Sequence, residues 1–217
     1  MATSQGVPGP DKAGAKRAAA RVVDPIATGL LRIGLSPDAV TAIGAVGVVA
    51  ASVGLYARGS LVVGSLVITA FALSDMLDGA MARISGRGGP WGAFLDSTLD
   101  RISDAAIFAS LAYWYLRGGD DALLGALALY ALIAGQIVSY ARARAEGLGM
   151  NASGGIAERT ERLFVVLLTT FLAGLGVPYV QAGGLWLLVV ATSVTVVQRM
   201  LAVRRQTRGA GTEGGAA

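Results

Sequence analysis

The sequence predicts an all-α integral membrane protein with six transmembrane helices and an N-terminal interfacial helix. Of its 217 residues, 54% are hydrophobic and only 15% are charged. This composition is typical of membrane proteins and argues against a soluble domain with one core. Six apolar segments have about the 20 residues that a spanning helix needs. Lys and Arg are also distributed unevenly among the turns that connect these segments.

The N-terminal part, residues 1–36, is expected to be a cytoplasmic segment with a juxtamembrane amphipathic helix. Residues 12–34 mix five basic side chains with Ala, Val, Ile and Leu, a pattern typical of a helix lying against anionic head groups. A simple topology signal explains the same pattern equally well. The Asp24-Pro25 pair could break this helix into two pieces. Because the segment is polar and has no cleavage site, it is not expected to be a signal peptide.

The membrane domain is predicted to comprise residues 37–205, followed by a disordered Gly-rich tail at 206–217. Its six expected spans are residues 38–57, 60–82, 91–116, 122–141, 162–179 and 183–203. An even number of spans places both termini on one side. Of the 18 Lys and Arg residues, only Arg58 and Arg117 fall in the turns assigned to the outside. The positive-inside rule therefore predicts a multi-pass protein of the cell membrane with both termini in the cytoplasm.

Four aspartates interrupt this apolar chain: Asp75, Asp78, Asp96 and Asp100. Asp75 and Asp78 are three residues apart and Asp96 and Asp100 four, so each pair shares one helix face. A carboxylate at mid-bilayer costs roughly 2.5–3.5 kcal/mol on translocon scales, so four together indicate a function. The alternative is a set of unrelated polar residues at helix ends. For Asp104, on the same stripe, the favoured interpretation is a buried partner for an arginine or a group that supports a metal ligand.

Two such helices facing each other predict an all-oxygen metal site. The chain has neither His nor Cys, which excludes imidazole and thiolate ligands, and hard divalent cations prefer oxygen. Mg²⁺ is the expected ion, with Mn²⁺ as the other possibility. The carboxylates lie toward the cytoplasmic end of their spans, within reach of a soluble substrate.

The residues between the aspartates form a longer pattern with fixed gaps. It reads Asp75-x-x-Asp78-Gly79-x-x-Ala82-Arg83, then eight residues, then Gly92-x-x-x-Asp96-x-x-x-Asp100. This pattern resembles the signature of the CDP-alcohol phosphotransferases, membrane enzymes that transfer a group from a CDP-linked donor to an alcohol. The match is far more specific than a short glycine motif.

The resemblance implies a role for each of these residues. Asp75, Asp78, Asp96 and Asp100 are expected to bind two Mg²⁺ ions, and Asp100 is also expected to act as the catalytic base. The resemblance further assigns a set of residues to CDP-diacylglycerol binding: Asp38, Ala39, Val40, Thr41, Gly79, Arg83 and Gly89. From the sequence itself, Ser36-Pro37 is expected to cap the first span.

A cytoplasmic arginine cluster predicts a phosphorylated acceptor. Guanidinium groups bind phosphate bidentately, and the candidate residues are Arg142, Arg162, Arg199 and Arg204, of which motif position favours Arg142, Arg162 and one of Arg199 and Arg204. Positive-inside topology explains any single one of them equally well. The segments 140–146 and 154–162 resemble those of the actinobacterial phosphatidylinositol phosphate synthases. Relatives often have Lys where this chain has Arg142.

The sequence-based prediction is therefore a phosphatidylinositol phosphate synthase that transfers the phosphatidyl group of CDP-diacylglycerol to 1D-myo-inositol 3-phosphate and releases CMP. Membrane lipid and a second copy of the chain, as a homodimer, are the expected partners, and no nucleic acid is expected. The alternatives are a phosphatidylglycerophosphate synthase, which uses glycerol 3-phosphate, a non-enzymatic magnesium transporter, or a scaffold. A transporter should place its charges along a path across the bilayer, whereas here they cluster at one end.

Overall fold

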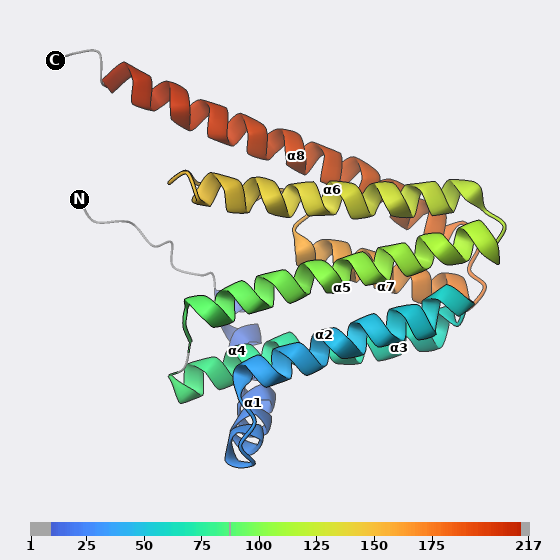
Figure 1. Ribbon diagram of the computed structural model, residues 1–217, viewed down its shortest axis with the longest axis horizontal. Helices are drawn as coiled ribbons and strands as arrows, with labels where there is room; N and C mark the ends of the chain where they lie inside the picture. The colour runs from blue at the N-terminus through green and yellow to red at the C-terminus, as the bar shows by residue number, and fades with distance from the viewer. Residues whose placement is uncertain (1–9, 87, 214–217) are drawn as a thin grey trace. The chain divides into compact units, whose positions relative to one another are not determined.

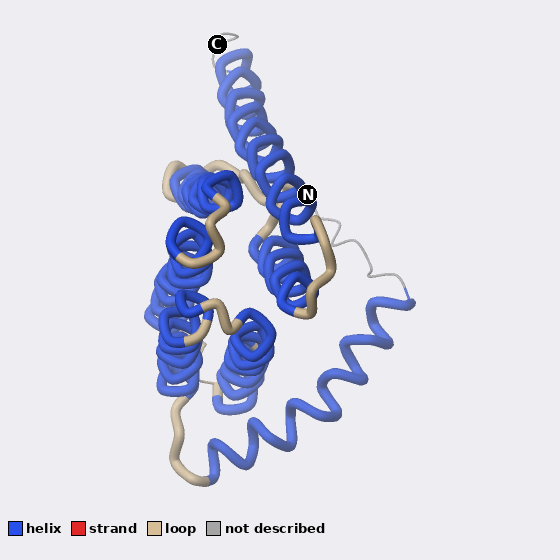
Figure 2. Tube along the Cα trace, turned by 90° about the vertical axis from the view of Figure 1, so that its right-hand side faces the viewer, coloured by secondary structure: helices blue, strands red, loops and turns tan. Residues whose placement is uncertain are grey.

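The computed structural model describes the backbone of residues 10–86 and 88–213 and the side chains of residues 21–86 and 88–208. Within these ranges the regular elements are helices, without a strand (Figure 2). They are α1 (Pro10–Arg32), α2 (Pro37–Gly54), the 3-10 turn η1 (Tyr56–Arg58), α3 (Leu61–Ala72), α4 (Ser74–Ser85), α5 (Pro90–Arg117), α6 (Ala122–Glu146), α7 (Arg159–Gly174) and α8 (Val180–Glu213). The all-α prediction is confirmed.

Four helical stretches among the described residues are long and apolar enough to cross a membrane: Pro37–Arg58, Leu61–Ser85, Ala122–Glu146 and Val180–Arg208. The expected spans 91–116 and 162–179 are not among these four stretches. Helix α5 has 28 residues but carries the aspartates and Arg101 in its first half. Helix α7 has 16 residues, about 24 Å at 1.5 Å per residue, less than the roughly 30 Å of a hydrocarbon core. The count of six spans therefore stays a prediction.

The chain forms two compact units whose boundaries fall inside α2, α3 and α5. The first unit contains the chain up to Val46 together with Ala70–Asp100. The second contains Gly47–Thr69 and the chain from Arg101 onward. All four signature aspartates lie in the first unit, and all four acceptor arginines lie in the second.

The core of the first unit forms where α1 packs on α4. Its buried side chains are Ala27 from α1, Val40 from α2, and Ala80 and Met81 from α4. Around them pack Val23, Leu30, Leu31, Leu35 and Leu77. The α1 members of this core recur at the spacing of one helix face, as expected for an amphipathic helix.

Helix α1 runs unbroken through Pro25, so the expected break at Asp24-Pro25 is wrong. Proline lacks the N–H that would bond the carbonyl four residues earlier, on Arg21. Arg21 and Val22 are exposed, so this carbonyl can be satisfied from outside the protein. Residues 1–9 of the expected N-terminal segment lie outside the described residues.

Helix α8 continues to Glu213, beyond the point where the sequence predicted a disordered tail from residue 206. Gln206 explains part of this difference, because its side chain bonds to the loop before α7 and ties this turn of α8 to the protein. Residues 214–217 lie outside the described part of the chain.

A break at Leu73 divides the second expected span into α3 and α4. Ser74 donates a hydrogen bond from Oγ to the carbonyl of Phe71 at 2.6 Å, which competes with the helical ladder at this point. Gly44 of α2 is buried against the break, and a Cβ at Gly44 would overlap with Ser74 Oγ. The break makes Asp75 a first-turn residue of α4.

In the second unit, α8 packs against both α6 and α7, as Figure 1 shows for α6 and α8. Fully buried apolar side chains include Leu111, Ala128, Val166 and Leu185. Small residues bring α7 and α8 close together, because a Cβ at Gly184 would lie 2.5 Å from Thr169 Cγ2. Close contact through small residues is typical of membrane helices.

Candidate active site

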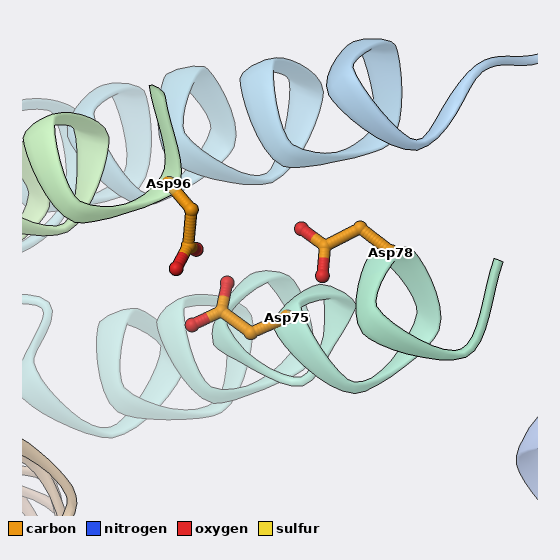
Figure 3. A group of neighbouring side chains, drawn as sticks. All are labelled: Asp75, Asp78 and Asp96. Atoms are coloured by element: carbon orange, nitrogen blue, oxygen red, sulfur yellow. The ribbon is translucent and has the colours of Figure 1, made fainter. Parts of the chain in front are cut away.

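Three of the four signature aspartates come together. Asp75 and Asp78 on α4 and Asp96 on α5 each offer a carboxylate oxygen, and these oxygens all lie within 4.8 Å of one another. Figure 3 shows the three side chains pointing toward a common centre. Asp78 is 8% exposed, and the other two are half-buried. We call these three residues the carboxylate cluster.

The donor set of the carboxylate cluster suits a hard divalent cation. Like charges this close disfavour each other's ionised form unless a cation balances them. The cluster offers only oxygens, which Mg²⁺ and Mn²⁺ prefer. Thr41 adds a polar support, because its Oγ1 donates to Asp78 Oδ2 at 2.5 Å. Partners of this kind orient metal ligands. The cluster can therefore hold a divalent cation.

Asp100 is not among these three residues. It is half-buried and lies on α5 one helical turn after Asp96. The i, i+4 spacing keeps it on the same face of α5 as Asp96.

Residues at the start of α2 stand beside the carboxylate cluster. Ser36 Oγ accepts from the backbone N–H of Ala39 at 3.2 Å, which confirms the predicted cap. Asp38 faces the start of α5, since a Cβ at Gly92 would lie 3.4 Å from Asp38 Oδ1. Ala39 is half-buried, whereas Val40 is 7% exposed and its side chain belongs to the core.

The glycine of the α4 signature has an open side. Within the described residues, the nearest group to a Cβ built at Gly79 is Arg83 Nη1, at 3.5 Å. Close packing of helices does not explain this glycine. Arg83 is exposed one turn further along α4, and Gly89 is exposed with its carbonyl accepting from the N–H of Ala93 at 3.1 Å.

The four acceptor arginines differ in exposure. Arg142 on α6 is exposed, and its Nε donates to Glu146 Oε1 at 2.8 Å. Arg204 on α8 is also exposed. Arg162 and Arg199 are only 2% and 4% exposed. The structure thus presents two of these guanidinium groups at the surface and buries the other two.

Arg162 on α7 is paired with Asp104 on α5. Its Nη2 donates to Asp104 Oδ2 at 3.0 Å, and its Nη1 donates to the carbonyl of Ala157 at 3.1 Å. Arg159 Nε lies 3.4 Å from the other oxygen of Asp104. The interpretation of Asp104 as a buried arginine partner is confirmed. Gly135 of α6 makes room for this pair, since a Cβ there would lie 3.1 Å from Arg162 Nε.

Arg199 on α8 bonds to backbone carbonyls of two other segments. Its Nη1 donates to Val138 of α6, and its Nε donates to Gly154 at 3.2 Å. Its Nη2 lies 3.8 Å from Glu158 Oε1. A cavity of about 390 Å³ adjoins Arg199 and the loop 152–156.

Sequence reasoning missed how residues 151–158 are held. Thr195 and Gln206 of α8 bond to the backbone of this loop. Both look like ordinary polar residues near the end of a span. The paired glycines at 154 and 155 were the available signal, because both adopt positive φ, at +97° and +134°.

Comparison with known proteins decides the family. Residues 34–203 match the family model described as CDP-alcohol phosphatidyltransferase. The chain belongs to this family. With its apolar helices it is therefore an integral membrane enzyme, a CDP-alcohol phosphatidyltransferase of phospholipid biosynthesis.

Named relatives of this phosphatidyltransferase are similar over most of their length. The phosphatidylinositol phosphate synthase of Streptomyces avermitilis is 47% identical over 194 residues, covering 86% of this chain and 80% of the relative. The enzyme of the same name from Mycobacterium tuberculosis H37Rv is 45% identical over 193 residues, covering 85% and 87%.

Solved structures of a relative show the same fold. The crystal structure of M. tuberculosis phosphatidylinositol phosphate synthase with CDP-DAG bound has a TM-score of 0.82 and 44% identity, covering 84% of this chain and 94% of that one. The structure of the same protein in complex with manganese and citrate has a TM-score of 0.81, also at 44% identity, covering 83% and 88%.

Proposed function

We propose that this phosphatidyltransferase is a phosphatidylinositol phosphate synthase. It transfers the phosphatidyl group of CDP-diacylglycerol to the free hydroxyl of 1D-myo-inositol 3-phosphate and releases CMP. The observation that carries the proposal is the carboxylate cluster, found in a chain 44–47% identical to enzymes of that name. The M. tuberculosis relative with CDP-DAG bound supports the donor.

We assign a dinuclear Mg²⁺ site, which also accepts Mn²⁺, to Asp75, Asp78, Asp96 and Asp100. The manganese complex of the M. tuberculosis relative and the convergence of three of these carboxylates support this assignment. Divalent ions bound there neutralise the pyrophosphate of the donor and favour in-line attack at phosphorus. The role of the aspartates is to fix the geometry of that site.

Asp100 takes the proton in this proposal. The acceptor hydroxyl oxygen forms a bond to the phosphatidyl phosphorus, the bond from that phosphorus to the CMP oxygen breaks, and the hydroxyl proton passes to Asp100. Its place one turn after Asp96 on α5 supports this role, because a base must lie within hydrogen-bond reach of the proton that it accepts.

The CDP moiety is proposed to bind around the first turn of α2 and the open side of Gly79. Asp38, Ala39, Val40 and Thr41 form that turn. Val40 contributes its backbone only, because its side chain is in the core. Arg83 offers an exposed guanidinium to a phosphate of the donor, and Gly89 an exposed backbone.

Arg142, Arg162, Arg199 and Arg204 are proposed to bind the phosphate of the acceptor. Arg142 and Arg204 are exposed and can bind it directly. Arg199 keeps hydrogen-bonding capacity at Nη2, which is 3.8 Å from Glu158 Oε1, and it adjoins the cavity beside α8. Arg162 brings a second buried guanidinium, held in place by Asp104.

We further propose six spans in the cell membrane, a cytoplasmic active site and a homodimer. The topology rests on the distribution of Lys and Arg. Helix α1 is proposed to lie at the membrane interface, since its exposed residues include the apolar Val22 and Ile26, one turn apart, and the basic Arg32. Interfacial helices carry exposed apolar side chains on one face and basic side chains on the polar face.

The acceptor is tested by CMP release from CDP-diacylglycerol with Mg²⁺. Inositol 3-phosphate, free inositol and glycerol 3-phosphate are compared, with Asp100→Asn as the blank. Turnover only with inositol 3-phosphate is the expected result. Turnover with glycerol 3-phosphate instead identifies a phosphatidylglycerophosphate synthase, and folded protein that releases no CMP with any acceptor contradicts the proposal.

Thr41→Val is expected to raise the Mn²⁺ concentration for half-maximal CMP release about tenfold, the usual cost of losing a group that orients a metal ligand. The substitution keeps the shape of the side chain but removes the hydroxyl that bonds Asp78 Oδ2. Thr28→Val is the matched control, because the hydroxyl of Thr28 bonds the carbonyl of Asp24 in its own helix. Equal Mn²⁺ requirements in the two variants contradict this role for Thr41.

A further inference from the structure

The loop between α6 and α7 is fastened along α8. We call residues Asn151–Glu158 the strap. Its contacts with α8 join Thr195 Oγ1 to Ala157 N at 3.1 Å, Arg199 Nε to Gly154 O at 3.2 Å, Gln206 Oε1 to Asn151 N at 2.9 Å, and Gln206 Nε2 to Asn151 O at 2.6 Å. The strap therefore runs antiparallel to α8 and is bonded at three points.

The α8 residues that contact the strap lie on one face of that helix. Thr195, Arg199 and Gln206 are four and seven residues apart, so they lie on one face of α8. Gly155 permits the close approach, because it has φ +134° and a Cβ there would overlap with Thr195 Cγ2. The loop and the helix face are complementary in shape.

The strap supplies the carbonyl groups that hold both buried acceptor arginines. Arg162 Nη1 donates to Ala157 O at 3.1 Å, and Arg199 Nε donates to Gly154 O. The backbone of Ala157 therefore makes two hydrogen bonds: its carbonyl accepts from Arg162, and its N–H donates to Thr195 Oγ1. Ala157 and Thr195 are 2% and 0% exposed, so water does not replace this bond readily.

We propose that Thr195 is a positioning residue for acceptor binding. Its hydroxyl fixes Ala157 through the backbone N–H, and the carbonyl of the same residue orients the guanidinium of Arg162 toward the phosphate of inositol 3-phosphate. Thr195 Oγ1 also donates to the carbonyl of Ala191 at 2.8 Å, which leaves its lone pairs for the N–H of Ala157. This proposal rests on the proposed function, because it assigns Arg162 to the acceptor.

Thr195→Val tests the proposal, since it keeps the shape of the side chain and removes the hydroxyl. The KM for inositol 3-phosphate is expected to rise about tenfold, because Arg162 loses the fixed carbonyl that orients it. The KM for CDP-diacylglycerol and kcat are expected to stay within twofold. Thr195→Ser retains the hydroxyl and is expected to restore the wild-type KM.

Thr192→Val is the matched control on the same helix. Thr192 is equally buried, but its hydroxyl bonds the carbonyls of Leu188 and Val189 within α8. If Thr195→Val and Thr192→Val give the same KM for inositol 3-phosphate, or if Thr195→Val raises both substrate KM values equally, the proposal is overturned.

Amide hydrogen exchange of the strap separates this proposal from the proposed function. It needs no turnover, so it is measured on wild type, Thr195→Val and Thr192→Val alike. Faster exchange at residues 151–158 in Thr195→Val alone is the expected result. Unchanged exchange overturns the positioning role, whereas a wild type that does not turn over inositol 3-phosphate overturns the proposed function, and with it the acceptor role of Thr195, even when the exchange pattern is the expected one.

Discussion

Asp78→Asn lowers CMP release from CDP-diacylglycerol at least about a hundredfold. Loss of a group that only orients a metal ligand costs up to about a hundredfold, and loss of a ligand itself is expected to cost at least as much. The amide matches the carboxylate in size but has no charge and one oxygen fewer. Asp78 is the most buried member of the carboxylate cluster and accepts from Thr41, so water does not replace it easily. CMP release at saturating Mn²⁺ measures the loss.

Asp24→Asn is the control for this substitution. Asp24 is an exposed aspartate on α1, so its variant is expected to release CMP at the wild-type rate. The thermal stability of Asp78→Asn should not fall, because removing one of three clustered negative charges relieves repulsion when no cation is bound. A folded Asp78→Asn enzyme with wild-type activity is incompatible with a metal role for the carboxylate cluster.

Asp104→Asn lowers the free energy of unfolding by about 3–5 kcal/mol, the usual cost of removing one partner of a buried ion pair. Arg162 is left with its charge inside the second unit, at 2% exposure. The free energy is measured by denaturant titration in detergent micelles.

Two further variants decide whether the buried charge causes this loss. Asp104→Leu combined with Arg162→Met removes both charges and is expected to recover most of the stability. Glu146→Gln breaks the exposed pair with Arg142, whose side chains are 52% and 47% exposed, and is expected to cost at most about 1 kcal/mol. A similar loss in Asp104→Asn and Glu146→Gln contradicts the assignment of Asp104 and Arg162 as a buried pair.

Periodicity and charge predicted the features that depend on local sequence. The i, i+3 spacing of Asp75 and Asp78 placed both carboxylates on one face of α4, and the structure brings Asp96 to them. Asp104 continues the stripe of Asp96 and Asp100 but was interpreted as a buried partner for an arginine, and its partners proved to be Arg162 and Arg159. The shared face of Asp75 and Asp78 was predictable because helix geometry alone fixes which side chains of one helix share a face.

Features that depend on tertiary contacts were not predicted. Helix α1 continues through Pro25, although the carbonyl of Arg21 has no N–H partner there, and this part of the helix is exposed. The end of α8 is helical where composition indicated disorder. The burial of Arg162 and Arg199 follows from the strap, whose bonds to Thr195 and Gln206 join residues 38 and 55 positions apart. No local pattern reports such distant pairs.

The most direct test of the metal site is anomalous diffraction from crystals soaked with Mn²⁺ and CDP-diacylglycerol. Two peaks about 3.5–4 Å apart are predicted, the spacing of two-metal sites. The peaks should lie within about 2.5 Å of carboxylate oxygens from Asp75, Asp78 and Asp96, with Asp100 completing the set. Manganese bound elsewhere, or an empty carboxylate cluster in an active crystal, would contradict the account.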